Sequence, residues 1–328
     1  MQQVRIFFLL ALGSWASEKG ATKEGFVRIS PENPVVEFGG SLVLNCSASC
    51  ETIGLETAFT KVPNGTGSNW RAFLLTDIRD WVSDPLCYAN CGDHQPKPAS
   101  ATITIYKPPE SVELNPVPEM EAGKLYDLMC RVSGVAPIRN LTVTLLKGAE
   151  QLLVKTFEDH TAPEAGPVVV KHRIIAQQND HNKPVTCQTS LDLRPRGPLL
   201  KNTSHSILRI FDFAGTPQLH VGLFLEAGIE MTVTCDASEV SPAEEAVFDL
   251  RFAGMPLTLN TRVTGGVASA QAVVIPSSVG EHELLCRVSL GPVTKNVKKM
   301  VNVFGTSHIC NWVNQSHSIL IQITFNNL

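Results

Sequence analysis

Apolar and polar residues alternate in short runs along most of this chain. Examples are 141–145 (LTVTL), 167–174 and 268–275, each bordered by Gly, Pro, Ser or Asn. Side chains of a strand point alternately to its two faces, whereas a helix repeats every 3.6 residues. No useful length of the chain has the helical spacing. The pattern therefore predicts many short strands, each with one buried face.

The same ten-residue pattern occurs three times, ending at Cys46, Cys130 and Cys235. Each copy places Glu nine residues and Gly seven residues before the cysteine. Large apolar residues stand four and two positions before it and share its strand face; they are Leu42 and Leu44, Tyr126 and Leu128, and Met231 and Val233. We expect the glycine to form the turn that opens each strand.

Each copy is followed by a second cysteine: Cys87, Cys187 and Cys286 respectively. Copies of the pattern lie 84 and 105 residues apart, the size of a sandwich domain and too long for a solenoid repeat. The sequence therefore predicts an all-β protein of three tandem immunoglobulin-like β-sandwiches arranged end to end. Bridges Cys130–Cys187 and Cys235–Cys286 would join their sheets. The Trp and Tyr hallmarks of antibody domains are missing around these cysteines.

Proline-containing joints divide the chain. We expect a signal peptide at 1–20, sandwiches at 26–106, 108–213 and 216–304, and an atypical tail at 305–328. Prolines at 108–109 and 217 restrict the backbone between modules, which favours an extended string over one globule.

The first residues suggest export. Arg5 precedes an apolar run at 6–12 and then small residues, as in a secretory signal peptide; a buried N-terminal strand is the alternative. Five N-x-[ST] sequons agree with an extracellular glycoprotein; they begin at Asn45, Asn64, Asn140, Asn202 and Asn314. The most apolar later segment, 319–325, is too short to cross a bilayer. We therefore expect a secreted variant or a piece of a membrane-anchored protein.

Charge and motifs exclude several functions. A net charge of −4 without a basic stripe argues against nucleic-acid binding. Protease, hydrolase and nucleotide-binding motifs are missing, so no enzyme, cofactor or small-molecule substrate is expected. The sequence Asp180-His-Asn could suggest catalysis, but we expect a turn there.

The first module has four cysteines in two C-x3-C pairs, Cys46 and Cys50, then Cys87 and Cys91. A zinc site is one interpretation. Residues four apart on a strand are roughly 13 Å apart, too far for a bridge. The second and sixth strands of such a sandwich run parallel, so facing residues keep a constant offset. This favours Cys46–Cys87 and Cys50–Cys91. Cys310, in the tail, is the odd ninth cysteine.

The first module resembles the N-terminal domain of the intercellular adhesion molecule family. The resemblance rests on 39–50 (GGSLVLNCSASC), 54–57 (GLET) and 87–91 (CYANC). It continues in the second module through 111–114, 140–146 and 191–197, and is looser in the third. Members of that family are single-pass plasma-membrane proteins.

The resemblance implies a function in leukocyte cell–cell adhesion. In the family, the acidic residue of the GLET-like motif completes the coordination of Mg²⁺ in the inserted domain of a leukocyte β2 integrin. Carried over, that residue is Glu56, and the metal belongs to the partner. The other implied contacts are Thr57, Lys61, Leu86, Tyr88, Asn90 and Gln95. A soluble decoy or regulator of the membrane form is the alternative function, a homophilic spacer is a third, and a homodimer is retained as an additional assembly.

Overall fold

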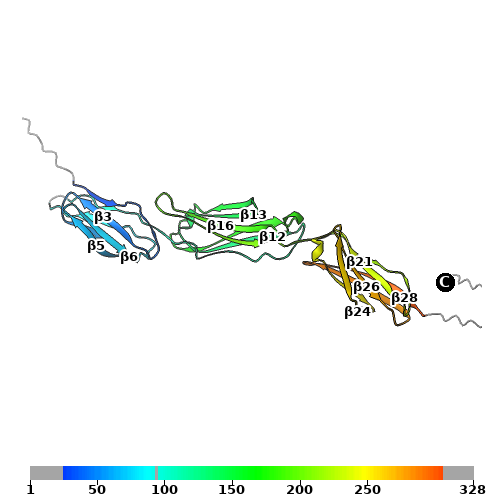
Figure 1. Ribbon diagram of the computed structural model, residues 1–328. Helices are drawn as coiled ribbons and strands as arrows, with labels where there is room; N and C mark the ends of the chain where they lie inside the picture. Colours follow the sequence, from blue (N-terminus) through cyan, green and yellow to red (C-terminus); the bar gives the residue numbers. More distant parts are fainter. Residues whose placement is uncertain (1–24, 93–94, 306–328) are drawn as a thin grey trace, which may run out of the picture.

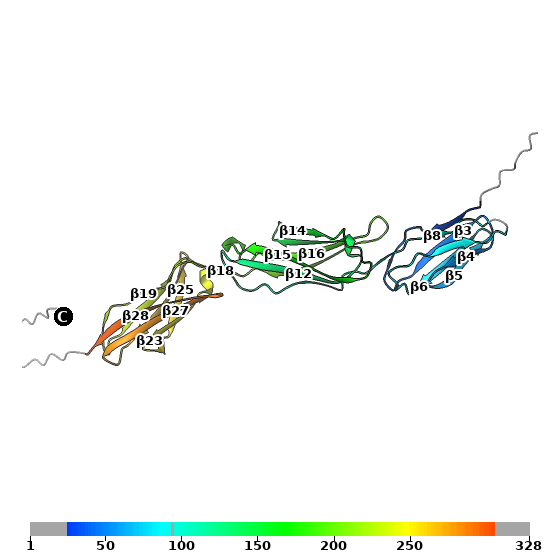
Figure 2. The same ribbon diagram turned by 180° about the vertical axis from the view of Figure 1, so that it is seen from behind.

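The computed structural model describes residues 25–92 and 95–305. These residues form sheets gathered into three bodies that follow one another along an elongated molecule (Figure 1; Figure 2 shows the reverse side). Within them the only helical pieces are three short 3₁₀ turns, η1 (Ile138–Asn140), η2 (Gln178–Asp180) and η3 (Ala243–Glu245). The predicted all-β fold class of tandem sandwiches is therefore confirmed.

The first body packs two sheets around one core. One sheet has the order β1-β3-β6-β5 and the other β4-β7-β8, and β2 pairs in parallel with β9. The strands are β1 (Val27–Ser30), β2 (Val35–Glu37), β3 (Leu42–Ala48), β4 (Ile53–Glu56), β5 (Thr60–Gly67), β6 (Trp70–Thr76), β7 (Leu86–Ala89), β8 (Ala99–Ser100) and β9 (Thr104–Tyr106).

The second body has the sheets β10-β12-β15 and β14-β13-β16-β17. Its strands are β10 (Ser111–Leu114), β11 (Met120–Glu121), β12 (Leu125–Val135), β13 (Leu141–Lys147), β14 (Glu150–Thr156), β15 (Gly166–Ile175), β16 (Pro184–Asp192), β17 (Leu199–Ile207) and β18 (Ile210–Phe213).

The third body has the sheets β19-β21-β26-β25 and β20-β28-β27-β23-β24. Its strands are β19 (Gln218–His220), β20 (Phe224–Glu226), β21 (Met231–Ala237), β22 (Val240–Ser241), β23 (Val247–Phe252), β24 (Met255–Pro256), β25 (Leu259–Thr264), β26 (Val267–Val274), β27 (Gly280–Leu290) and β28 (Val293–Phe304).

The repeated sequence pattern opens the equivalent strand in each body. Its glycines, Gly39, Gly123 and Gly228, have φ angles of 79°, 80° and 81°. This left-handed conformation is readily adopted only by glycine, which explains the residue at this turn. The apolar residue two positions before each cysteine is almost fully buried; these residues are Leu44, Leu128 and Val233.

Both joints are packed. At the first, Lys107 and Ala136 exchange backbone hydrogen bonds of 2.9 and 3.1 Å, and Val35 packs against the second core. At the second joint, the small sheet β11-β18-β22 crosses from one body to the next. The Lys295 ammonium also donates to the carbonyl oxygens of Ala214 and Gly215, at 2.9 and 2.7 Å. Backbone hydrogen bonds and side-chain packing thus connect each body to the next.

Candidate adhesion surface

The candidate surface is the outer face of the sheet β4-β7-β8. Pairing is antiparallel, with Glu56 opposite Leu86 and Gly54 opposite Tyr88. The intervening residues point inward, where Leu55 and Cys87 are almost fully buried. Because side chains alternate along a strand, Glu56, Leu86 and Tyr88 share the outer face. The structure therefore brings these three predicted residues together.

Glu56 is the last residue of β4, and its side chain is exposed. The next residue, Thr57, accepts a hydrogen bond of 3.2 Å from the backbone N–H of Phe59 through its hydroxyl oxygen. This local turn ends the strand and sends the chain into the core, where Phe59 is buried. Within 25–92 and 95–305, no basic side chain forms an ion pair with the Glu56 carboxylate. Its oxygens are open to an external cation.

Tyr88 lies directly over Gly54. A Cβ added to Gly54 would fall 2.3 Å from the ring carbon Cζ and 2.4 Å from the hydroxyl oxygen of Tyr88. The ring therefore occupies the space that any other residue at 54 would fill, although 45% of the Tyr88 surface remains exposed. Gly54 was not among the predicted site residues. Its place in the GLET motif, opposite an aromatic residue, was the available signal.

Asn90 and Gln95 lie beyond Tyr88. Asn90 donates its backbone N–H to the Thr52 carbonyl at 2.9 Å and accepts from the Gly92 N–H through Oδ1 at 3.3 Å. Together with Tyr88, these residues border a hollow of about 430 Å³ whose remaining wall is the segment 96–98 and Ala89. The Pro-Lys-Pro wall was not predicted from the sequence.

Lys61 comes from the other sheet. It lies on β5, and its ammonium reaches across to donate to the carbonyl oxygen of Leu55, next to Glu56. Asn90 directly follows the end of β7, four residues beyond Leu86 and therefore about 13 Å away at ~3.3 Å per residue. The predicted set thus splits into an acidic end, with Glu56, Thr57, Lys61 and Leu86, and a hollowed end, with Asn90 and Gln95; Tyr88 connects the two.

Four disulfides join the predicted pairs. They are Cys46–Cys87, Cys50–Cys91, Cys130–Cys187 and Cys235–Cys286, with Cα separations of 5.6, 5.5, 6.2 and 6.5 Å. Each cysteine of the first C-x3-C pair is therefore bonded to a cysteine of the second pair. No thiolate is left to bind zinc, so the zinc interpretation is wrong. Among the described residues, no group of three or more His, Cys, Asp or Glu side chains could hold a metal ion.

The predicted sequons differ in their surroundings. Asn45, Asn64 and Asn202 are exposed, while Asn140 is half-buried at a joint. Asn314, Cys310, most of the 305–328 tail and the proposed signal peptide lie outside the described residues. In the described part of the chain, no helix is long and apolar enough to cross a membrane.

The Asp180-His-Asn sequence forms a turn with structural contacts. Asp180, almost fully buried, accepts from the ammonium groups of Lys147 at 2.7 Å and Lys183 at 2.8 Å. Burial alone would raise the pKa of the Asp180 carboxyl, but these hydrogen bonds and charges outweigh burial and lower it. His181 hydrogen-bonds the Ile210 backbone and lies 3.7 Å from the Glu245 carboxylate. These contacts link the second body to the second joint.

Comparisons with known proteins agree with this architecture. The model of the intercellular adhesion molecule N-terminal domain matches residues 22–111. The model of the ICAM-1/3/5 D2 domain matches 217–304, the third sandwich, where the resemblance from motifs was looser. The crystal structure of an ICAM-5 D1-D4 ectodomain fragment superposes with a TM-score of 0.73 at 32% identity, covering 86% of this chain and 77% of that one.

Curated relatives cover most of the chain. Intercellular adhesion molecule 1 of Rattus norvegicus is 36% identical over 296 residues, 86% of this chain. Intercellular adhesion molecule 3 of Homo sapiens is 34% identical over 291 residues, also 86% of this chain. Intercellular adhesion molecule 5 of Homo sapiens is 33% identical over 304 residues, 90% of this chain. The chain spans 52% of the first two relatives and 33% of the third. With these matches in sequence and fold, the chain belongs to the intercellular adhesion molecule family.

Proposed function

We propose that this protein is a cell-adhesion ligand for leukocyte β2 integrins and that the Glu56 carboxylate completes the coordination of Mg²⁺ in the integrin inserted domain. The intercellular adhesion molecules are non-enzymatic adhesion proteins, in agreement with the expectation that the chain is not an enzyme. The proposed role is extracellular. The four disulfides support that placement, because such bonds persist in oxidising compartments.

The observation that carries the proposal is the position of Glu56. Its exposed carboxylate ends β4, forms no ion pair among the described residues, and stands beside Leu86 and near Tyr88 on one face. Mg²⁺ prefers oxygen ligands in octahedral geometry and usually takes one or two carboxylates. One carboxylate that replaces a metal-bound water would therefore give a strong, directional contact.

The neighbouring residues would shield that contact. Tyr88 offers an exposed aromatic surface and Leu86 a half-buried aliphatic one. Apolar contacts around a central polar anchor exclude water, and electrostatic interactions strengthen when water is excluded. Lys61 stands at the rim, where its charge would affect association rate more than affinity. Compared with the pattern of the family that the chain resembles, the segment between Cys50 and Glu56 is short and Leu86 replaces a more flexible Met. Both differences would influence which integrin is preferred.

The test is adhesion of leukocytes that carry β2 integrins to a surface coated with the full chain. We expect adhesion in Mg²⁺, loss of adhesion when the cation is chelated, and loss again when the integrin inserted domain is blocked by an antibody. Adhesion that survives both treatments would contradict the proposal and would favour the homophilic spacer. Cells of the same line without the integrin are the matched control.

A further inference from the structure

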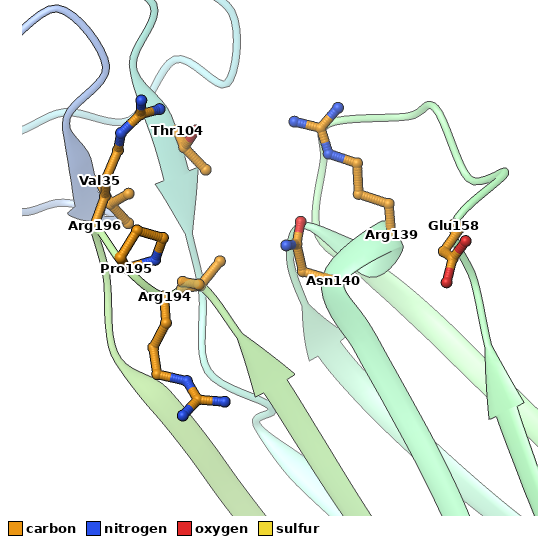
Figure 3. Close-up of a pocket in the computed structure, with 9 residues that line it drawn as sticks. Val35, Thr104, Arg139, Asn140, Glu158, Arg194, Pro195 and Arg196 are labelled. Carbon is orange, nitrogen blue, oxygen red and sulfur yellow. The ribbon is translucent and has the colours of Figure 1, made fainter.

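A hollow of about 590 Å³ lies where the first and second sandwiches meet (Figure 3). The first sandwich contributes Val35 of β2 and Thr104 of β9. The second contributes Arg139 and Asn140 of η1, Glu158, and the turn 193–196 between β16 and β17. Its volume is in the range of ligand pockets, roughly 300–1,000 Å³. The hollow is therefore large enough to hold a group of small-molecule size.

A sequon asparagine forms part of its wall. Asn140 begins the sequence Asn-Leu-Thr and is half-buried, unlike Asn64 and Asn202. Its amide nitrogen Nδ2 donates to the Asp192 carbonyl oxygen at 2.9 Å. Figure 3 shows the Asn140 amide at the edge of the gap between the two sandwiches. Because Asn140 lines the hollow, a group attached to this amide would start at the wall of the hollow.

The turn that holds Asn140 is itself fixed. The Arg194 guanidinium donates to both carboxylate oxygens of Asp192, at 3.0 and 2.7 Å, and these bonds lower the pKa of the Asp192 carboxyl to about 2. Gly197 packs so closely that a Cβ there would lie 2.8 Å from Cγ1 of Val35. The hydrogen-bond acceptor of Asn140 thus lies at the end of β16, next to a turn that is packed against the first sandwich.

The remaining lining suits a carbohydrate. The guanidinium groups of Arg139 and Arg196 offer donors, the Glu158 carboxylate offers acceptors, and Thr104 offers a hydroxyl. Val35 and Pro195 supply small apolar areas, which match the C–H faces of sugar rings. In the figure, the Arg139 and Arg196 side chains stand on opposite sides of the gap.

We propose that this hollow is the seat of the first sugar residues of an N-linked oligosaccharide on Asn140, which acts as a strut between the first and second sandwiches. The inference rests on the extracellular placement proposed above and is independent of integrin binding. The strut would fix the direction in which the sheet β4-β7-β8 is presented. An N-glycan that lies in a protein groove loses mobility and accessibility compared with one on an open strand.

The attachment has an ordinary chemical balance. A lipid-linked oligosaccharide diphosphate is the co-reactant. The bond from Nδ2 of Asn140 to the anomeric carbon forms, the bond from that carbon to the diphosphate oxygen breaks, Nδ2 loses one proton, and the lipid diphosphate leaves. One N–H remains on Nδ2 and can still donate to Asp192. Since Asn140 is half-buried in the folded chain, the transfer precedes closure of the joint.

Site-resolved removal of the glycans tests the proposal. The full chain is produced with high-mannose glycans and digested under native conditions with an endoglycosidase that cuts between the first two sugars. We expect trimming at Asn140 to be at least tenfold slower than at Asn64 and Asn202, and equally fast at all three after denaturation. An unmodified Asn140, or trimming as fast as at Asn202, would overturn the proposal.

A pair of variants tests the strut itself. Thr142→Ala removes the sequon and keeps the Asn140 side chain, whereas Thr142→Ser keeps the sequon. Small-angle X-ray scattering should show a broader distribution of molecular length for Thr142→Ala and an unchanged one for Thr142→Ser. Arg196→Ala should speed trimming at Asn140 alone. Identical scattering from the two Thr142 variants would refute the strut, whatever the outcome for integrin binding.

Discussion

Two disulfides connect the same two strand segments of the first sandwich, so removal of one should cost less than loss of an isolated bridge. Cys46–Cys87 and Cys50–Cys91 each span 41 residues. Alone, a bridge of that span would stabilise the fold by about 4 kcal/mol through loop entropy. With Cys46–Cys87 intact, the second bridge closes a ring of only about ten residues, which corresponds to about 2.7 kcal/mol. Cys50→Ala with Cys91→Ala should therefore lower the free energy of unfolding by about 2.7 kcal/mol.

Tryptophan fluorescence during urea unfolding follows the stability of the first sandwich. Within the described residues the tryptophans are Trp70 and Trp81, both in the first sandwich, and Trp81 stacks on Phe38 with ring centroids 4.6 Å apart. The matched control removes the bridge of the third sandwich through Cys235→Ala and Cys286→Ala. That change should leave the urea midpoint of the fluorescence transition unchanged, because the bridge it removes lies outside the first sandwich.

Two other outcomes would refute the reasoning. A loss near 4 kcal/mol would mean that the two bridges act independently. A loss below about 1 kcal/mol would mean that packing already fixes both strand ends, because the loop-entropy model then has nothing left to explain.

Two further predictions concern single side chains. Gly54→Ala should force the Tyr88 ring off β4, lower stability by about 1 kcal/mol through overpacking, and weaken integrin binding several-fold in surface plasmon resonance; unchanged binding would contradict it. Asp180→Asn should cost about 2 kcal/mol in urea unfolding, because it leaves the largely buried Lys147 ammonium with only the exposed Glu150 as an ionic partner, and Lys183→Ala should cost far less. Since folding lowers the pKa of Asp180, its stabilising effect is present above the unfolded value of 3.8 and lost as pH falls through the folded one.

Much of the fold could be predicted because its signals are local. The spacing from Glu and Gly to cysteine predicted a strand, its buried face and the turn before it. In the structure Gly39 has the positive φ of that turn and Leu44 is fully buried on the predicted face. The two bridges of the first sandwich could also be predicted from the sequence. Residues that face each other on two parallel strands are separated by a constant number of positions, and Cys46–Cys87 and Cys50–Cys91 both span 41 residues. Leu86, Tyr88 and Asn90 were expected at the site only because the chain resembles the family, not from the pattern of the residues themselves.

The rest depends on approaches between segments far apart in sequence. Lys61 reaches the Leu55 carbonyl only because β5 of one sheet lies near β4 of the other. The hollow beside Asn140 requires two sandwiches in fixed orientation. Asp180 accepts a hydrogen bond from Lys147, which lies on a strand 33 positions earlier in the sequence. Neither periodicity nor motif spacing carries this information, because each contact is set by packing across sheets or joints.

The central claim is tested most directly by the affinity of the full chain for an activated β2 integrin inserted domain in Mg²⁺, measured by surface plasmon resonance. Glu56→Gln keeps the size of the side chain and removes its charge, and Glu51→Gln is the control, an exposed acid five positions earlier. We predict that Glu56→Gln weakens binding at least 100-fold, equivalent to about 2.7 kcal/mol, while Glu51→Gln changes it less than threefold. Equal affinities for the Glu56→Gln protein and its parent would contradict the account.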